Sequence, residues 1–142
     1  MLSPDPGREA DERALMDQPP YELDALRREI VLATLQEVCR YRRWILLAAH
    51  VRTERVHVVV QAEATPERVL NDFKVYASRR LTEAGFENSE RKRWTRHGST
   101  RYLWKREQVI AAIRYVVEEQ GLPLVVYENT DWENPPTSVP HA

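Results

Sequence analysis

The chain has 142 residues, of which 30% are charged, and its formal net charge is -1. This length allows about one domain with one modest core. No apolar run approaches the roughly 20 residues of a membrane span, and the first residues lack a signal-peptide pattern, so we expect no membrane partner. The single cysteine, Cys39, cannot form an internal disulfide and suits a reducing cytosol.

The small net charge conceals a segregation of charge along the chain. Residues 74–106 contain ten lysines and arginines against three glutamates, whereas residues 118–142 contain five acidic residues and neither lysine nor arginine. We call residues 74–106 the basic zone. Such a zone can bind phosphate groups, because neutralising them releases counterions. A solvated face without a ligand is the alternative.

The first half of the chain predicts a tail, a helix and a β-hairpin. Residues 1–20 hold four prolines without periodicity and read as a mobile tail. Apolar residues recur at helical spacing from Tyr21 to Arg43. The run Trp44–Val51 is apolar on both faces, which predicts a central strand. After a tight connection, Val56–Ala62 is expected to return as its hairpin partner.

The second half predicts two helices and two short strands. Thr65 is a good N-cap and Pro66 a good first residue for a helix that runs to Ala84. The remaining segments are a basic loop at 91–100, a short edge strand at 101–104, a helix at 105–120, a short strand at 122–127 and a Pro-rich mobile tail at 129–142.

The order of these elements is that of a ferredoxin-like α+β plait, with an antiparallel sheet and helices on one face. That plait begins with a strand before its first helix, and nothing in residues 1–20 can supply one. We therefore predict a plait that lacks its first strand, formed by residues 21–128.

Two positions on the second hairpin strand are candidates for chemistry. Arg55 and His57 are two apart, so they point to the same side of a strand. The valines at 56, 58 and 60 point to the other side. A histidine can bind a metal ion, but one histidine alone cannot hold it. A purely structural histidine is the alternative. His50, across the turn, is expected to be buried in its strand, although it could serve as a substitute ligand.

Tyr115 is the most diagnostic residue of the last helix. At about 100° per residue, it falls nearly opposite the apolar stripe of that helix. A tyrosine on a solvent face indicates docking or chemistry; packing against a neighbouring strand or a dimer partner is the alternative. Glu119 lies one turn further on and projects beside it.

These segments together resemble the HUH-type single-tyrosine transposases, the insertion-sequence and REP-associated tyrosine transposase group. The family's hairpin carries His-hydrophobic-His, where this chain has Arg55-Val56-His57. Its next helix has a lysine, a serine and an arginine at spacings similar to those in Asn71–Leu81. Its nucleophile helix resembles Ile113–Gln120. The resemblance covers about residues 21–120.

The resemblance implies that Tyr115 is the nucleophile that nicks and rejoins single-stranded or hairpin DNA during DNA transposition. It implies metal ligation by His57 and Glu119, with Gln120 as a less well-phased ligand, and Mg²⁺ or Mn²⁺ as the cofactor if the site is active. Arg55 occupies the position of the lost ligand and has no lone pair for a metal. We therefore expect impaired nicking, with DNA binding retained.

Residues of the basic zone and the hairpin are the expected DNA contacts. Aromatic residues there can stack on unpaired bases while arginines follow the backbone. The predicted contacts are Arg55, Lys74, Arg79, Arg91, Lys92, Arg93, Trp94, Arg96, His97 and Arg101. The resemblance also implies a bacterial cytosol, with association with the nucleoid. A non-catalytic nucleic-acid-binding module and a ferredoxin-like dimerisation domain, as a homodimer, are the competing interpretations.

Overall fold

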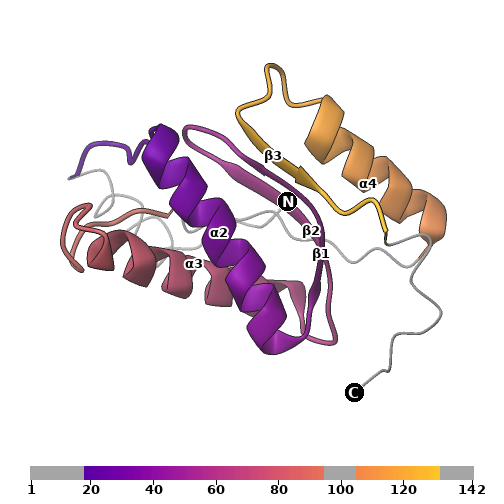
Figure 1. The fold of residues 1–142 in the computed structure, drawn as a ribbon, viewed down its shortest axis with the longest axis horizontal. Helices are drawn as coiled ribbons and strands as arrows, with labels where there is room; N and C mark the ends of the chain where they lie inside the picture. Colours follow the sequence, from indigo (N-terminus) through magenta and orange to yellow (C-terminus); the bar gives the residue numbers. More distant parts are fainter. Residues whose placement is uncertain (1–17, 95–104, 132–142) are drawn as a thin grey trace, which may run out of the picture.

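The computed structural model describes residues 18–94 and 105–131 and has an α+β fold (Figure 1). Two helices and a hairpin come first, and a third helix and a strand follow. The elements are α2 (Ala25–Arg42), β1 (Ile45–Val51), β2 (Val56–Gln61), α3 (Pro66–Glu83), α4 (Arg106–Glu118) and β3 (Val125–Glu128). The predicted fold class is confirmed, and the arrangement is compatible with a ferredoxin-like plait that lacks one strand.

The sheet is antiparallel with the strand order β2-β1-β3. As predicted, β1 is the central strand and β2 is its hairpin partner. The pairing shifts between Leu46 and Ala48, and beyond this irregularity His50 lies opposite His57. On the other edge of β1, Val126 of β3 pairs with the same His50. The strand predicted at 122–127 therefore begins three residues later.

Local capping explains where the two long helices begin. The side chain of Asp24 accepts a hydrogen bond from the backbone N–H of Arg27, so α2 starts at Ala25 rather than at Tyr21. Thr65 caps α3 in the same way through the N–H of Arg68, and Pro66 occupies the first turn as predicted.

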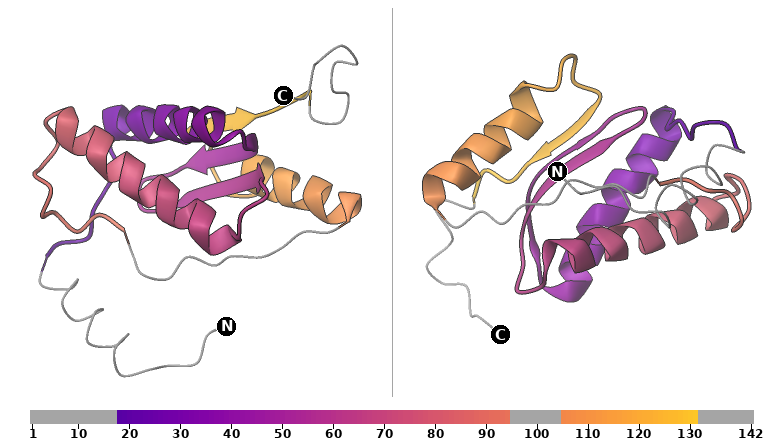
Figure 2. Two further views of the ribbon diagram at one scale, coloured as in Figure 1. Left: turned by 90° about the horizontal axis from the view of Figure 1, so that it is seen from below. Right: turned by 180° about the vertical axis from the view of Figure 1, so that it is seen from behind.

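The helices cover both faces of the sheet (Figures 1 and 2). The expected placement of the first two helices is confirmed, because α2 and α3 share a core cluster with the valines at 56, 58 and 60. The last helix lies on the opposite face, where Ile113 and Val116 of α4 pack against Val59 of β2 and Leu47 of β1. The helices as a set are therefore not confined to one face.

Two residues of the expected apolar stripe of α2 are outside the core. Leu26 is 61% exposed and Tyr41 is 70% exposed. Helical spacing alone overestimated the stripe, because α2 buries one narrow side against the sheet and α3. The short edge strand expected at 101–104 lies outside the described residues.

Candidate nucleic-acid interface

The turn between β1 and β2 is fixed by backbone hydrogen bonds. The N–H of Arg52 donates to the carbonyl of Arg55 at 2.8 Å, which closes a turn with Thr53 and Glu54 at its tip. The carbonyl of Thr53 accepts a hydrogen bond of 2.7 Å from the N–H of Leu23. The segment before α2 therefore holds the turn in place, and Arg55 is presented to solvent at its end.

Arg52 joins this turn to the end of α4. Its Nη1 donates to the backbone carbonyl of Gln120 and, at 3.3 Å, to that of Leu122. Gln120 and Leu122 lie just after the last helical residue, Glu118, so the guanidinium binds the segment that leaves α4 and adds positive charge near the negative end of the helix. The last turn of α4, with Tyr115, is thereby held at the hairpin end that carries Arg55. The sequence analysis missed this role of Arg52, because a cation in a turn is no signal for it.

We call five residues of these neighbouring elements the hairpin–helix junction. They come from the β1–β2 turn, from the start of β2 and from the end of α4. The junction consists of Arg52, Arg55, His57, Tyr115 and Glu119.

His50 is a structural residue next to the junction. Its side chain is fully buried, and its Nε2 accepts a hydrogen bond of 3.1 Å from the N–H of Leu124. Burial, together with the nearby Arg52, lowers its pKa, although the Val116 carbonyl opposes this. The neutral imidazole therefore ties the segment before β3 to the sheet. Because its Nε2 lone pair is used, this nitrogen is not available as a substitute metal ligand.

His57 lies opposite His50 on the α4 side of the sheet and is half-buried. Burial is the largest cause of its lowered pKa, and His50, Arg55 and Arg52 add positive charge that acts in the same direction. The imidazole is thus kept neutral near pH 7. A neutral imidazole flanked by two guanidinium groups can donate or accept a hydrogen bond beside a bound phosphate.

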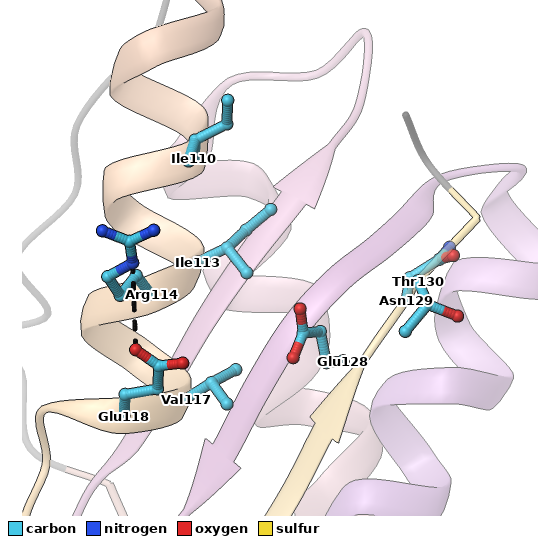
Figure 3. Close-up of a pocket in the computed structure, with 8 residues that line it drawn as sticks. All are labelled: Ile110, Ile113, Arg114, Val117, Glu118, Glu128, Asn129 and Thr130. Carbon is cyan, nitrogen blue, oxygen red and sulfur yellow. Dashed lines mark ion pairs between the residues drawn. The ribbon is translucent and has the colours of Figure 1, made fainter. Parts of the chain in front are cut away.

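Tyr115 is on the solvent side of α4, as its helical phase predicts, and is 53% exposed. One edge of α4, which carries Ile110, Arg114 and Val117, faces β3 across a pocket of about 320 Å³ (Figure 3). At 100° per residue, Tyr115 and Glu119 fall on the other edge of the helix. That edge lies on the side of β2, which carries His57.

The pocket between α4 and β3 contains none of the predicted site residues. Its rim holds Arg114 and Glu118, which form an ion pair of 3.8 Å, and Glu128 of β3 (Figure 3). Two glutamates on this rim make the pocket unsuited to a phosphate. The junction on the other edge of α4 remains the better candidate for an anionic ligand.

The predicted metal ligands His57 and Glu119 do not belong to a larger cluster of metal-binding side chains in the part of the chain that the structure describes. Across residues 18–94 and 105–131, no group of three or more His, Cys, Asp or Glu side chains is placed to hold an ion. The amide nitrogen of Gln120 donates to the Tyr115 carbonyl at 3.4 Å, which ties this side chain to the last turn of α4. Arg55 offers no lone pair. The residues present do not fit the metal that the family resemblance implies, and we derive no step through one.

Two arginines predicted to contact DNA make hydrogen bonds within the fold. The Arg93 side chain is 1% exposed, and its Nη2 donates to the carbonyl of Phe86 at 2.6 Å and to the Thr82 hydroxyl at 3.2 Å. Arg91 donates to the side chain of Gln18 and the carbonyl of Pro19. Arg93 is therefore unsuited to contact DNA, because a buried guanidinium cannot reach a phosphate.

The other residues of the basic zone differ in their exposure. Lys92 and Arg79 are exposed, and the Arg79 guanidinium lies 5.5 Å from the centre of the Tyr76 ring. Burial lowers the pKa of Lys74. Trp94 is half-buried, and its Nε1 donates to the Ser78 hydroxyl at 2.7 Å, which fixes the ring on α3. The predicted contacts Arg96, His97 and Arg101 lie outside the described residues.

Comparisons of the chain with protein-family models, characterised proteins and solved structures gave no match. The resemblance to single-tyrosine transposases therefore rests on the motifs of the sequence. Among the helices of the described residues, none is both long and apolar enough to span a membrane.

Proposed function

We propose that the protein binds single-stranded or hairpin DNA at the hairpin–helix junction. The observation that carries this proposal is the pair of hydrogen bonds from Arg52 to the carbonyls at the end of α4. They hold the helix of Tyr115 at the hairpin end that carries Arg55. A cation for a phosphate and an aromatic ring for a base are thus presented by one rigid part of the molecule.

The chemistry of the junction favours a single strand over a blunt duplex. Arg55 is exposed and can neutralise a backbone phosphate, while the exposed ring of Tyr115 can stack on a base. Bases of a single strand or a hairpin loop are free to stack in this way, and such stacking contributes about 1–3 kcal/mol per base. The exposed cations Lys92 and Arg79 on and near α3 can extend the path of the backbone.

For catalysis, the resemblance implies attack by the Tyr115 hydroxyl on a phosphodiester. The new bond joins phosphorus to the tyrosine oxygen, the bond to the 3′ oxygen breaks, and a proton passes to that oxygen. We propose that this step is impaired here, because Arg55 replaces a ligand and no metal site is formed by the described residues. The second candidate, a nucleic-acid-binding module without catalysis, is favoured by the same substitution.

Binding of a fluorescently labelled DNA hairpin tests the proposal. Replacing Arg55 by Gln should weaken binding several-fold and lower the slope of log K against log salt by about 0.7, the value for one phosphate contact on a single strand. The matched control is Arg114→Gln, on the other edge of α4, which should leave both quantities unchanged. Equal affinity and slope for Arg55→Gln and wild type would exclude the junction as the binding site.

A further inference from the structure

The strand β2 forms an edge of the sheet without the usual protection. In the order β2-β1-β3 it has one strand neighbour among residues 18–94 and 105–131. Its sequence, VHVVVQ, contains no Asp, Glu, Lys, Arg or Pro. Natural edge strands are usually protected by charges, prolines, bulges or short length, because an open edge pairs with other strands. By contrast, the edge strand β3 has four residues and ends in Glu128.

The hairpin geometry shows which backbone groups of β2 face outward. Arg52 and Arg55 form a hydrogen-bonded pair next to the turn, and such pairs alternate along an antiparallel ladder. The backbone groups of His57 therefore point to His50 on β1. Those of Val56, Val58 and Val60 point away from β1, to the open edge.

We propose that two copies of the chain pair through this edge, β2 against β2, antiparallel and centred on Val58. This register places Val56 opposite Val60 and His57 opposite Val59 of the second copy. Arg55 then lies opposite Gln61, and Glu63 of the second copy is its diagonal neighbour. The pairing is self-complementary, as a two-fold interface requires, and it brings opposite charges rather than like charges together at both ends.

The faces of the sheet are compatible with this pairing. On one face the valines at 56, 58 and 60 pack against the core cluster of α2 and α3, and the pairing would set the valine rows of the two copies side by side. On the other face, the edge of α4 on the β2 side carries the small residue Ala112 next to Tyr115 on the helical wheel. Small side chains allow two helices to approach closely. The two His57 side chains become diagonal neighbours, about 7–8 Å apart, so the two junctions lie side by side.

Disulfide trapping tests the register directly. In the proposed dimer, positions 55 and 61 of opposite copies form a close, non-hydrogen-bonded pair, so Arg55→Cys/Gln61→Cys should oxidise to a covalent dimer linked 55 to 61. Within one chain these positions are about 20 Å apart along the strand, too far for a disulfide. The matched control, Arg55→Cys/Ala62→Cys, places the two cysteines on opposite faces and should stay uncrosslinked. A monomeric Arg55→Cys/Gln61→Cys variant under oxidation would overturn the proposal.

Sedimentation of proteins without introduced cysteines provides the second measurement. Wild type and Val58→Thr, which keeps the outward N–H, should sediment as dimers, whereas Val58→Pro should be a monomer because proline removes that N–H. If circular dichroism shows that Val58→Pro does not fold, the disulfide experiment alone tests the proposed register.

A wild-type monomer would overturn the proposal and indicate that the edge is free or is covered by another part of the same chain. A dimer unaffected by a folded Val58→Pro would place the interface elsewhere. No DNA is present in either experiment, so the result is independent of the proposed function.

Discussion

His50 and His57 lie directly opposite each other on β1 and β2, yet they have different environments. His50 is fully buried and accepts a hydrogen bond from Leu124, whereas His57 is half-buried in the hairpin–helix junction. One histidine therefore holds the segment before β3 in place, and the other belongs to the proposed binding site. Of these two neighbouring histidines, His50 therefore stabilises the fold and His57 belongs to the candidate site.

The stability of the fold should decrease on mild acidification. The pKa of His50 is lowered from its ordinary value of 6.5, mainly by burial, so the unfolded chain binds the proton more readily than the folded one. Above pH 6.5 both states are neutral and the contribution is constant. As the pH falls below 6.5, the free energy of unfolding should decrease until the folded-state pKa is passed. Urea unfolding at pH 7.5 and pH 5.5 measures this change.

The control for this pH effect is His50→Gln, whose side-chain amide can still accept the Leu124 N–H but does not titrate. Its urea midpoint should change less between the two pH values than that of wild type. His57→Gln should have a smaller effect than His50→Gln, because His57 is less buried. Identical pH dependence of wild type and His50→Gln would show that His50 is not the titrating group.

The two neighbouring bases Lys92 and Arg93 should behave in opposite ways. Arg93→Ala removes a buried guanidinium and leaves the Phe86 carbonyl without this donor, so it should destabilise the fold by about 2 kcal/mol. The Lys92 side chain is exposed, so Lys92→Ala should change the free energy of unfolding by less than about 0.5 kcal/mol. Thermal unfolding measures the first effect, and DNA titration at several salt concentrations should show a loss for Lys92→Ala. Stability unchanged in Arg93→Ala would contradict the structural role of this side chain.

Replacing Arg52 should loosen the end of α4 without unfolding the molecule. Arg52→Met keeps the aliphatic stem but removes the donors to the Gln120 and Leu122 carbonyls. Amide hydrogen exchange should become faster at residues 116–124 while the centre of α2 stays protected. Because the junction would lose its fixed geometry, affinity for a DNA hairpin should decrease as well. Unchanged exchange at residues 116–124 would contradict the role of Arg52 as a clamp.

Hydrophobic patterning and capping predicted most of the fold. The runs around β1 and β2 have few polar residues, and Thr65-Pro66 marks the start of α3 unambiguously, so these elements agree with the structure. The pairing of His50 with His57 follows from the tight turn at residues 52–55, whereas the shift between Leu46 and Ala48, which changes the partner of Leu46, had no signal in the sequence.

The candidate site was predictable only in part. The exposure of Tyr115 follows from its helical phase, and that of Arg55 from its place in a turn. Local charge could not separate Lys92 from Arg93, because burial of a guanidinium depends on how the chain after α3 folds back to supply the Phe86 carbonyl. The clamp from Arg52 to Gln120 joins residues far apart in sequence and left no local pattern.

Catalysis should depend on the identity of residue 55. With Mn²⁺, wild type should form no covalent adduct with single-stranded DNA, because Arg55 cannot bind a metal. Arg55→His restores a second imidazole on the face of His57 and should gain adduct and Mn²⁺ affinity, whereas Arg55→Gln should gain neither. Denaturing gels detect the adduct. Adduct that persists in Arg55→His/Tyr115→Phe would remove Tyr115 from the role of nucleophile.

Photo-crosslinking of a DNA hairpin with 5-bromouracil in its loop tests most directly whether the junction is the binding site. After trypsin digestion, crosslinked nucleotide should be found on the peptide 56–68, which contains His57, and at Tyr115 in the peptide that begins after Arg114. Unlabelled hairpin should compete for both crosslinks more strongly than blunt duplex. Crosslinks confined to other peptides, with His57 and Tyr115 unmodified, would contradict the account.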